Sequence, residues 1–198
     1  MRVIAGSARG ICLSSVKGSS TRPIPDRIKG SLFNILADVV PGSRVLDMYA
    51  GTGAIGIEAL SRGAKSCIFV ENEWSAIQVI KKNLEVTRLQ DKARVLNYDV
   101  FEIAPYLEKN NVEIDLVLAS PPYPLIEKNS YRDKLLTLFS SLCSKHIIQS
   151  EGLIMLQHRK TDFEMAPEVF SIELFDTRIY GDTQISFFKN TMKQGHSS

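Results

Sequence analysis

The chain has 198 residues, of which 44% are hydrophobic and 23% are charged. This length suits one α/β domain with a small extension, and the composition is ordinary for a globular protein. The sequence has no apolar stretch of the ~20 residues that a membrane span requires, and its start lacks the apolar region of a signal peptide. We therefore expect a cytoplasmic protein with no membrane partner.

The cysteines and histidines give no sign of a metal centre. The three cysteines include no Cys-x-x-Cys pair, which predicts reduced, mostly packed thiols. The three histidines are not spaced as metal ligands are. We expect no bound metal.

Positive charge gathers at the start of the chain. The net charge is +2, but residues 1–30 hold six Lys or Arg side chains and only one acid, Asp26. A basic segment of this kind fits contact with a polyanion such as nucleic acid. A solvated, partly disordered arm explains the charge equally well.

The first 25 residues read as an N-terminal extension. Short apolar runs at 2–5 and 11–13 flank a Gly- and Ser-containing segment, which indicates a hairpin. The polar residues 14–25 then predict a loop. From Asp26, a suitable N-cap, apolar residues recur at helical spacing as far as Val39.

Apolar runs then alternate with amphipathic segments. The runs predict strands at 45–49, 67–70, 94–98, 114–119 and 153–157, with helices near 54–62, 73–87, 100–109 and 130–144. In the second helix, four apolar residues share one face: Trp74, Ile77, Ile80 and Leu84. This alternation predicts a parallel sheet covered by helices.

The end of the chain has a different pattern. Candidate strands at 169–180 and 184–189 flank Gly181-Asp182, a hairpin signal. The whole pattern predicts a Rossmann-like class I methyltransferase fold, with a seven-stranded, mostly parallel sheet and one antiparallel strand in the C-terminal hairpin. Residues 26–190 would form this domain, and 191–198 a flexible tail.

A glycine-rich loop follows the first predicted parallel strand. The glycines of Gly51-Thr52-Gly53-Ala54-Ile55-Gly56 allow a sharp turn and close approach to a ligand. We expect the cofactor to lie against Tyr49, Ala50, Gly51, Thr52 and Gly53. Glu71, 18 residues after Gly53, ends the next strand and suits a ribose diol, with Asn72 beside it.

Two further acids suggest which cofactor binds. Asp99, followed by Val100, ends the third strand, where a carboxylate can accept from an adenine amino group. Asp47 lies just before the loop, where it would repel the pyrophosphate of NAD but suit the cationic tail of S-adenosylmethionine. Alternatively, Asp47 caps a turn, and Glu71 and Asp99 are helix N-caps.

Ser120-Pro121-Pro122-Tyr123 follows the fourth strand and is the candidate transfer site. An exocyclic base amine is a poor nucleophile, because its lone pair is delocalised into the ring. The Pro121 carbonyl and the Ser120 side chain could accept its hydrogens on a scaffold stiffened by Pro122, while Tyr123 stacks on the base. Alternatively, the prolines merely end a strand.

From its start to about residue 189, the chain resembles the bacterial enzymes that methylate N2 of guanine 966 in 16S ribosomal RNA. The resemblance lies in residues 2–6, Thr21-Arg22-Pro23 with Asp26-Arg27, Leu32-Phe33-Asn34, the cofactor loop at 46–53 with the helix at 58–64, residues 120–123, and Tyr180-Gly181-Asp182-Thr183. The family usually has Asp or Asn where this chain has Ser120. A hydroxyl is a shorter and weaker acceptor than a carboxylate.

The resemblance implies an S-adenosylmethionine-dependent enzyme that releases S-adenosylhomocysteine. Its partner would be 16S RNA or the small ribosomal subunit, with no obligate protein partner, and Arg9, Arg22 and Arg27 would lie near the RNA. Three alternatives stay open: a DNA adenine-N6 or cytosine-N4 methyltransferase, an NAD-dependent oxidoreductase, and a non-catalytic RNA-binding module.

Overall fold

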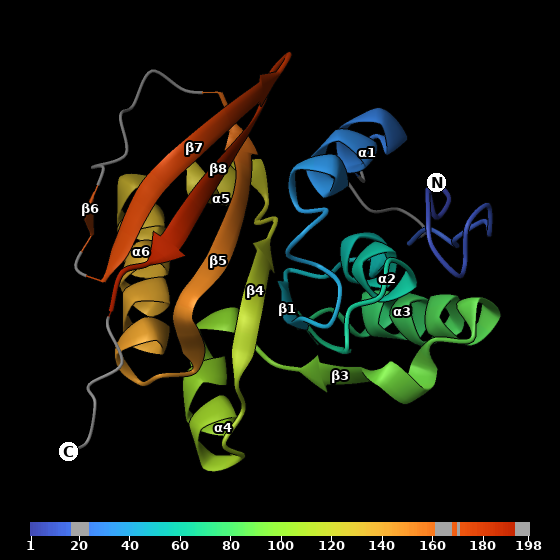
Figure 1. Ribbon diagram of the computed structural model, residues 1–198, viewed down its shortest axis with the longest axis horizontal. Helices are drawn as coiled ribbons and strands as arrows, with labels where there is room; N and C mark the ends of the chain where they lie inside the picture. Colours follow the sequence, from blue (N-terminus) through green and yellow to red (C-terminus); the bar gives the residue numbers. More distant parts are fainter. Residues whose placement is uncertain (17–23, 161–167, 170, 193–198) are drawn as a thin grey trace. The chain divides into compact units, whose positions relative to one another are not determined.

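The computed structural model describes residues 1–16, 24–160, 168–169 and 171–192 (Figure 1). The chain forms two compact units, Met1–Val100 and Phe101–Ser198. Each unit contains parallel strands and the helices that pack on them.

Three parallel strands form the sheet of the first unit. They are β1 (Arg44–Met48), β2 (Ser66–Glu71) and β3 (Ala93–Asn97), in the order β3-β2-β1. Helix α2 (Ala54–Ser61) packs on β1 and β2, and helix α3 (Trp74–Thr87) packs on β2 and β3. A 3-10 turn, η1 (Gln90–Lys92), leads into β3. Because helices cover the sheet, β1 is buried from Val45 to Met48.

The first unit starts with residues 1–16, which we call the arm, and a helix lies further along the chain. Arg2 and Cys12 form a single antiparallel bridge, and the Val3 amide donates to the Ile11 carbonyl at 3.0 Å. The expected hairpin path is therefore present, although it forms no regular strands. Helix α1 (Asp26–Ile35) is capped by Pro25, so Asp26 is its first residue rather than its cap.

The expected apolar face of α3 is correct at three positions and wrong at one. Ile77, Ile80 and Leu84 are buried, but Trp74 is 61% exposed. Trp74 is the first residue of the helix, and its ring contacts the Lys81 ammonium, 5.8 Å from the ring centroid. The indole is therefore outside the core.

The sheet of the second unit combines both strand directions. Strand β4 (Ile114–Ala119) runs parallel to β5 (Ile148–Arg159), and β8 (Thr183–Asn190) is antiparallel to β5 and to β7 (Ile172–Tyr180). A two-residue strand, β6 (Glu168–Val169), pairs with β7 and completes the order β4-β5-β8-β7-β6. Figure 1 shows β5, β8 and β7 side by side.

Helices accompany these strands. The 3-10 turn η2 (Val100–Glu102) precedes α4 (Ile103–Lys109), and α5 (Tyr123–Ile126) directly follows the proline pair. Helix α6 (Asn129–Ser144) packs on β5 and β7. All seven predicted strands are present, and β8 is the antiparallel strand expected in the C-terminal hairpin. The strand expected at 169–180 begins as β7 only at Ile172, and Val169 belongs to the separate short strand β6. Helix α5 is an addition that the sequence does not predict.

Candidate functional site

The glycine loop after β1 is a tight, left-handed turn. Gly51 and Gly53 have φ angles of 57° and 75°, and the Gly53 amide donates to the Ala50 carbonyl at 2.7 Å. Tyr49 also has a positive φ, 61°, which a residue with a side chain adopts only at a cost. The turn brings the chain from β1 into α2 within five residues, as the spacing of the glycines predicts.

Glu71 organises the ends of β1 and β2. One carboxylate oxygen accepts from the Gly51 amide at 2.8 Å, and the other accepts from Asn72 at 3.0 Å and Glu73 at 2.9 Å. Three of the roughly four acceptor positions of the carboxylate are thus used inside the protein. Glu71 therefore fixes the loop, and its expected role toward a ribose stays a prediction.

Asp47 is buried beneath the loop. Its carboxylate accepts from the Gly56 amide at 2.9 Å, in the first turn of α2. Burial raises the pKa of Asp47 to about 8; the Gly56 hydrogen bond opposes this shift, and the charge of Glu71 adds to it. This hydrogen bond matches the alternative in which Asp47 caps a turn. It keeps the carboxylate inside the protein, beneath the glycine loop.

The third glycine of the loop is required for packing. A Cβ built on Gly56 would lie 2.4 Å from the Phe69 ring and 2.8 Å from both the Asp47 carboxylate and the Cys67 sulfur. Glycine at position 56 therefore allows α2 to approach β2 more closely than a residue with a side chain would permit. Burial and the nearby Asp47 raise the pKa of the Cys67 thiol well above its ordinary value, so this cysteine is an inert packing group.

The remaining expected cofactor residues lie at the same edge of the sheet. Asp99 is exposed and Val100 is buried, and they follow β3 after one intervening residue, Tyr98. The Tyr98 amide donates to the Glu71 carbonyl at 3.2 Å, which joins the end of β3 to the end of β2. The structure thus brings together, in one unit, the predicted residues that follow the three parallel strands.

A polar residue absent from the sequence-based prediction connects the loop to the N-terminal arm. The Asn83 side chain, fully buried on α3, donates to the Thr52 carbonyl at 2.9 Å and to the Ser14 carbonyl at 3.1 Å. Its amide oxygen accepts from the Ser14 amide at 2.8 Å. The backbone of Thr52 is therefore fixed by the same α3 side chain that holds the arm at Ser14.

A buried ionic cluster joins the arm to α2. Glu58 accepts from the Ile4 and Ala5 amides at 2.8 and 3.0 Å, and forms ion pairs with Lys29 at 3.3 Å and Arg62 at 2.8 Å. Burial lowers the pKa of Lys29, while the charge of Glu58 opposes that shift. The sequence signal for this cluster is an acid within the apolar run of α2.

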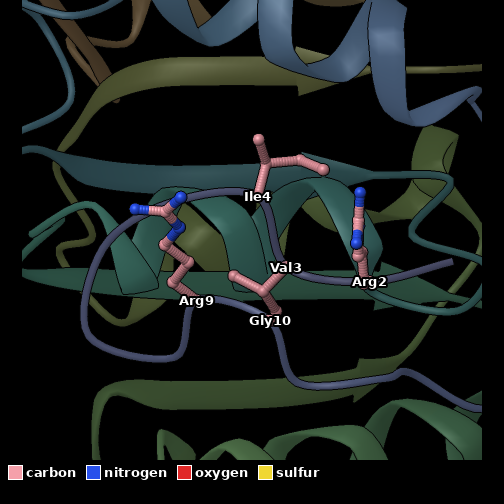
Figure 2. Close-up of a pocket in the computed structure, with 5 residues that line it drawn as sticks. All are labelled: Arg2, Val3, Ile4, Arg9 and Gly10. Atoms are coloured by element: carbon pink, nitrogen blue, oxygen red, sulfur yellow. The ribbon is translucent and has the colours of Figure 1, made fainter.

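The arm also carries a small basic pocket. Arg2, Val3, Ile4, Arg9 and Gly10 line a hollow of about 230 Å³. Figure 2 shows the side chains of Arg2 and Arg9 on either side of Ile4. Arg9 is exposed, as is Arg27 on α1, whereas Arg22 lies outside the described residues. Arg2 also forms an ion pair with Asp26 at 3.7 Å, so Arg9 is the guanidinium group of this hollow that best suits a phosphate.

The second unit holds the proline tetrapeptide at the end of β4. Pro122 caps α5, and its carbonyl accepts from the Leu125 and Ile126 amides at 3.0 and 3.3 Å. Pro121 is buried, while Ser120 and Tyr123 are half-buried. The prolines thus convert the strand end directly into a helical turn that begins at Tyr123.

Side chains from β5 and β8 meet this tetrapeptide. The Ser120 hydroxyl donates to the Gln157 side-chain oxygen at 3.3 Å, and the Gln157 side-chain nitrogen donates to the Tyr123 hydroxyl at 3.1 Å. The Tyr123 and Thr183 hydroxyls are 3.0 Å apart, and the Arg159 guanidinium lies 5.7 Å from the Tyr123 ring centroid. Sequence reasoning identified neither Gln157 nor Arg159.

His158, next to Gln157 on β5, is turned away from this cluster. Its ring nitrogens lie 3.0 Å from the Ser186 hydroxyl and 2.9 Å from the Arg159 carbonyl. Burial lowers the pKa of His158, so the imidazole is neutral near pH 7. This histidine is a hydrogen-bonded core residue rather than a general base.

Within the residues that the structure describes, no group of three or more His, Cys, Asp or Glu side chains could hold a metal ion. None of the helices in these ranges is both long enough and apolar enough to cross a bilayer.

Comparison with solved structures gives the class of the protein. The structure described as "Putative methyltransferase yhhF from Escherichia coli" matches with a TM-score of 0.78 at 27% identity, over 96% of this chain and 97% of that one. Together with the strand directions of the two units, this likeness defines a class I methyltransferase fold. The protein is an S-adenosylmethionine-dependent methyltransferase of this class.

The chain belongs to the family described as "Conserved hypothetical protein 95", whose model matches residues 1–189. It is 34% identical over 189 residues to the Bacillus subtilis (strain 168) protein named "Putative rRNA methyltransferase YlbH", covering 96% of this chain and 98% of the relative. It is 30% identical over 173 residues to the Haemophilus influenzae "Ribosomal RNA small subunit methyltransferase D", covering 87% and 86%.

Proposed function

We propose that the protein transfers a methyl group from S-adenosylmethionine to the exocyclic N2 of a guanine in 16S ribosomal RNA. The names of its relatives support ribosomal RNA as the substrate. The observation that carries the choice of an amine is the Ser120 hydroxyl. It gives its proton to Gln157, so its oxygen lone pairs serve as acceptors for the hydrogens of an amino group.

The first unit suits the cofactor. The backbone of Gly51 and Gly53, both left-handed, would lie against it, while Glu71 and Asp99 would accept from its ribose and adenine. S-Adenosylmethionine supplies an activated methyl group on a positively charged sulfur. When it is ionised, the buried acid Asp47 would favour such a cation and disfavour the pyrophosphate of NAD; its raised pKa of about 8 makes this effect strongest at alkaline pH.

The second unit would hold the amine. Ser120 and the Pro121 carbonyl accept its two hydrogens, which turns the nitrogen lone pair outward, and Tyr123 stacks on the base. Because Arg159 lies over one face of the Tyr123 ring, the base takes the opposite face. These residues would contribute to catalysis by aligning the amine nitrogen with the methyl group. The methylated amine would then lose its excess proton to water.

The basic arm would contact the RNA backbone. Arg9 lines the pocket in Figure 2, and Arg27 is exposed on the following helix, so both can pair with phosphates. Arg22 is proposed for the same role from the resemblance alone. A ribosomal substrate also implies that the protein acts in the cytoplasm.

Parallel methylation of three substrates tests the proposal: assembled small subunits that lack the modification, naked 16S RNA, and duplex DNA. We expect transfer to one of the RNA substrates and not to DNA, with the modified guanine identified by mass spectrometry. Transfer to DNA alone would make the protein an amino-methyltransferase of adenine or cytosine. Calorimetric binding of NAD, without binding of S-adenosylmethionine, would make it an oxidoreductase.

Ser120→Asp tests the acceptor role directly. A carboxylate accepts hydrogen bonds more strongly than a hydroxyl, so we expect faster methylation of the guanine amine. Ser120→Ala, which removes the acceptor, is the matched comparison and should be slower. Equal rates for all three proteins would show that Ser120 does not touch the amine.

A further inference from the structure

Gln157 occupies a central place in the transfer site that the proposed function does not explain. It lies on β5, only 8% exposed, between Ser120 at 3.3 Å and the Tyr123 hydroxyl at 3.1 Å. A buried side-chain amide that is hydrogen-bonded at both ends has one orientation, because its oxygen only accepts and its nitrogen only donates. Gln157 therefore acts on both neighbours in a fixed direction.

The direction matters for the chemistry of Ser120. A hydroxyl has one proton and two lone-pair positions. Once the proton is committed to the Gln157 oxygen, the serine can present only lone pairs to a substrate. The bond is long for a contact between two oxygens, and such contacts shorten when a substrate is bound. An amide turned the other way would donate to Ser120 and release its proton.

Tyr123 is held from two strands. Its oxygen accepts from Gln157, and its hydroxyl lies 3.0 Å from that of Thr183. Gln157 and Arg159 are two residues apart on β5 and so share a face of the sheet. Thr183 is paired with Arg159 across the strands. Strand register thus places the Gln157 amide, the Arg159 guanidinium and the Thr183 hydroxyl around Tyr123.

Thr183 also gives the C-terminal hairpin a role. It is the first residue of β8 and directly follows the Gly181-Asp182 turn. Gly181 has a φ of 61°, which allows the chain to reverse between β7 and β8. The turn therefore determines where the Thr183 hydroxyl meets Tyr123.

We propose that Gln157 and Thr183 are positioning residues for methyl transfer. Gln157 fixes Ser120 as a hydrogen-bond acceptor, and Gln157 and Thr183 together hold the Tyr123 ring in the plane on which the base stacks. This inference rests on the proposed function and adds to it two residues that do not themselves touch the base.

Gln157→Leu is the first test, with Gln149→Leu as its control. Gln149 lies on the same strand, and its side chain donates to the His146 carbonyl at 3.0 Å, away from Ser120 and Tyr123. We expect Gln157→Leu, which removes the hydrogen bonds to Ser120 and Tyr123, to lower kcat for the RNA substrate about tenfold. KM for the RNA should change less, and S-adenosylmethionine affinity should be unchanged. Gln149→Leu should match the wild type.

Gln157→Glu separates positioning from packing. A glutamate still accepts the Ser120 proton, and it can accept the Tyr123 proton in turn. We expect it to restore most of the kcat that Gln157→Leu loses. If both variants are equally slow while thermal melting shows both to be folded, Gln157 does not act through its hydrogen bonds, and the inference is wrong.

A double-mutant cycle tests Thr183. Thr183→Val keeps the shape of the side chain and removes its hydroxyl, so kcat should fall severalfold. In a Tyr123→Phe background, the same substitution should have no further effect, because the hydroxyl through which it acts is gone. Additive losses would contradict positioning through Tyr123.

A wild-type enzyme that methylates no RNA would refute the proposed function itself, whereas an active wild type with unchanged variants would refute this inference alone.

Discussion

Lys29 and Glu58 form an ion pair, with 3.3 Å between Nζ and Oε2, in which both side chains are completely buried. Glu58 also binds Arg62 and two amides of the arm. A buried pair contributes little by itself, but loss of one partner leaves a charge without compensation. This geometry makes Glu58 the most sensitive position of the cluster.

Glu58→Gln should therefore destabilise the protein by about 3–5 kcal/mol, because Lys29 keeps its buried charge without a counter-ion. Lys29→Met should cost less, since Glu58 retains Arg62 and both amides. Urea denaturation of the two variants gives these values. The exposed pair of Lys145 with Glu108 is the control, and Lys145→Met should change stability by less than about 1 kcal/mol.

The lowered pKa of Lys29 also predicts a pH dependence. Between its folded pKa and the ordinary value of 10.5, the unfolded chain binds more protons than the folded one. The contribution of Lys29 to stability should therefore rise with pH in this window. Denaturation midpoints across alkaline pH would show this slope in the wild type and not in Lys29→Met. Equal slopes would contradict the assignment.

Asp47 should make cofactor affinity depend on pH. Its pKa is raised to about 8, so at pH 6 the carboxyl is largely protonated and neutral. Ionisation above pH 8 adds a negative charge beside the loop, which should tighten the binding of a cationic cofactor. Calorimetry with Asp47→Asn is the control, because ionisations of the cofactor itself are common to both proteins. Identical pH profiles for the two proteins would show that ionisation of Asp47 does not affect cofactor binding.

The same shift predicts a stability effect of the opposite kind to that of Lys29. Because the folded pKa is raised, the folded state binds more protons than the unfolded state from the ordinary value of 3.8 up to about 8. The contribution of Asp47 is fully present below that window and falls as pH rises through it. Asp47→Asn, which cannot ionise, should lose this decline in thermal melts between pH 5 and pH 8.

Glu71→Gln should weaken S-adenosylmethionine binding about tenfold or more. The amide nitrogen of glutamine cannot accept, so either the Gly51 amide or the Asn72 and Glu73 amides just before α3 would lose a partner. Equilibrium binding by calorimetry measures the change. Glu73→Gln, on the neighbouring exposed residue, should leave the affinity unaltered.

Tyr123→Ala should lower kcat/KM for RNA about 5- to 150-fold, because one base–aromatic stack contributes ~1–3 kcal/mol. Cofactor affinity should remain at the wild-type value. Steady-state kinetics and calorimetry on the same preparation separate the two effects. An undiminished kcat/KM would exclude stacking on this ring.

Arg9→Ala should weaken RNA binding for all sequences alike and reduce the slope of log affinity against log salt by about one phosphate contact. Arg27→Ala should act in the same way. Arg178→Ala is a suitable control, since Arg178 is already paired with Asp176. Filter binding over a range of salt concentrations gives the slopes.

Regular patterns predict most of the fold but not the polar contacts inside it. Apolar runs and their spacing were sufficient for seven strands, and the distance from Gly53 was sufficient to find Glu71. Glu58, Asn83 and Gln157 are different, because each is a buried polar residue with at least one hydrogen-bond partner that is 37 to 69 residues away in the sequence. Burial of a polar group requires hydrogen bonds, yet the sequence does not say with which segment. Trp74 shows the converse, an apolar residue that periodicity wrongly assigns to the core.

The contacts of Glu58 with the Ile4 and Ala5 amides limit how the arm can be studied. A deletion of the first ten residues would remove the groups that neutralise part of a buried carboxylate, and would open the surface of α2 to water. A truncated protein that fails to methylate RNA would then report misfolding rather than lost recognition. Single substitutions at the exposed arginines are the informative alternative, because they leave the backbone of the arm in place.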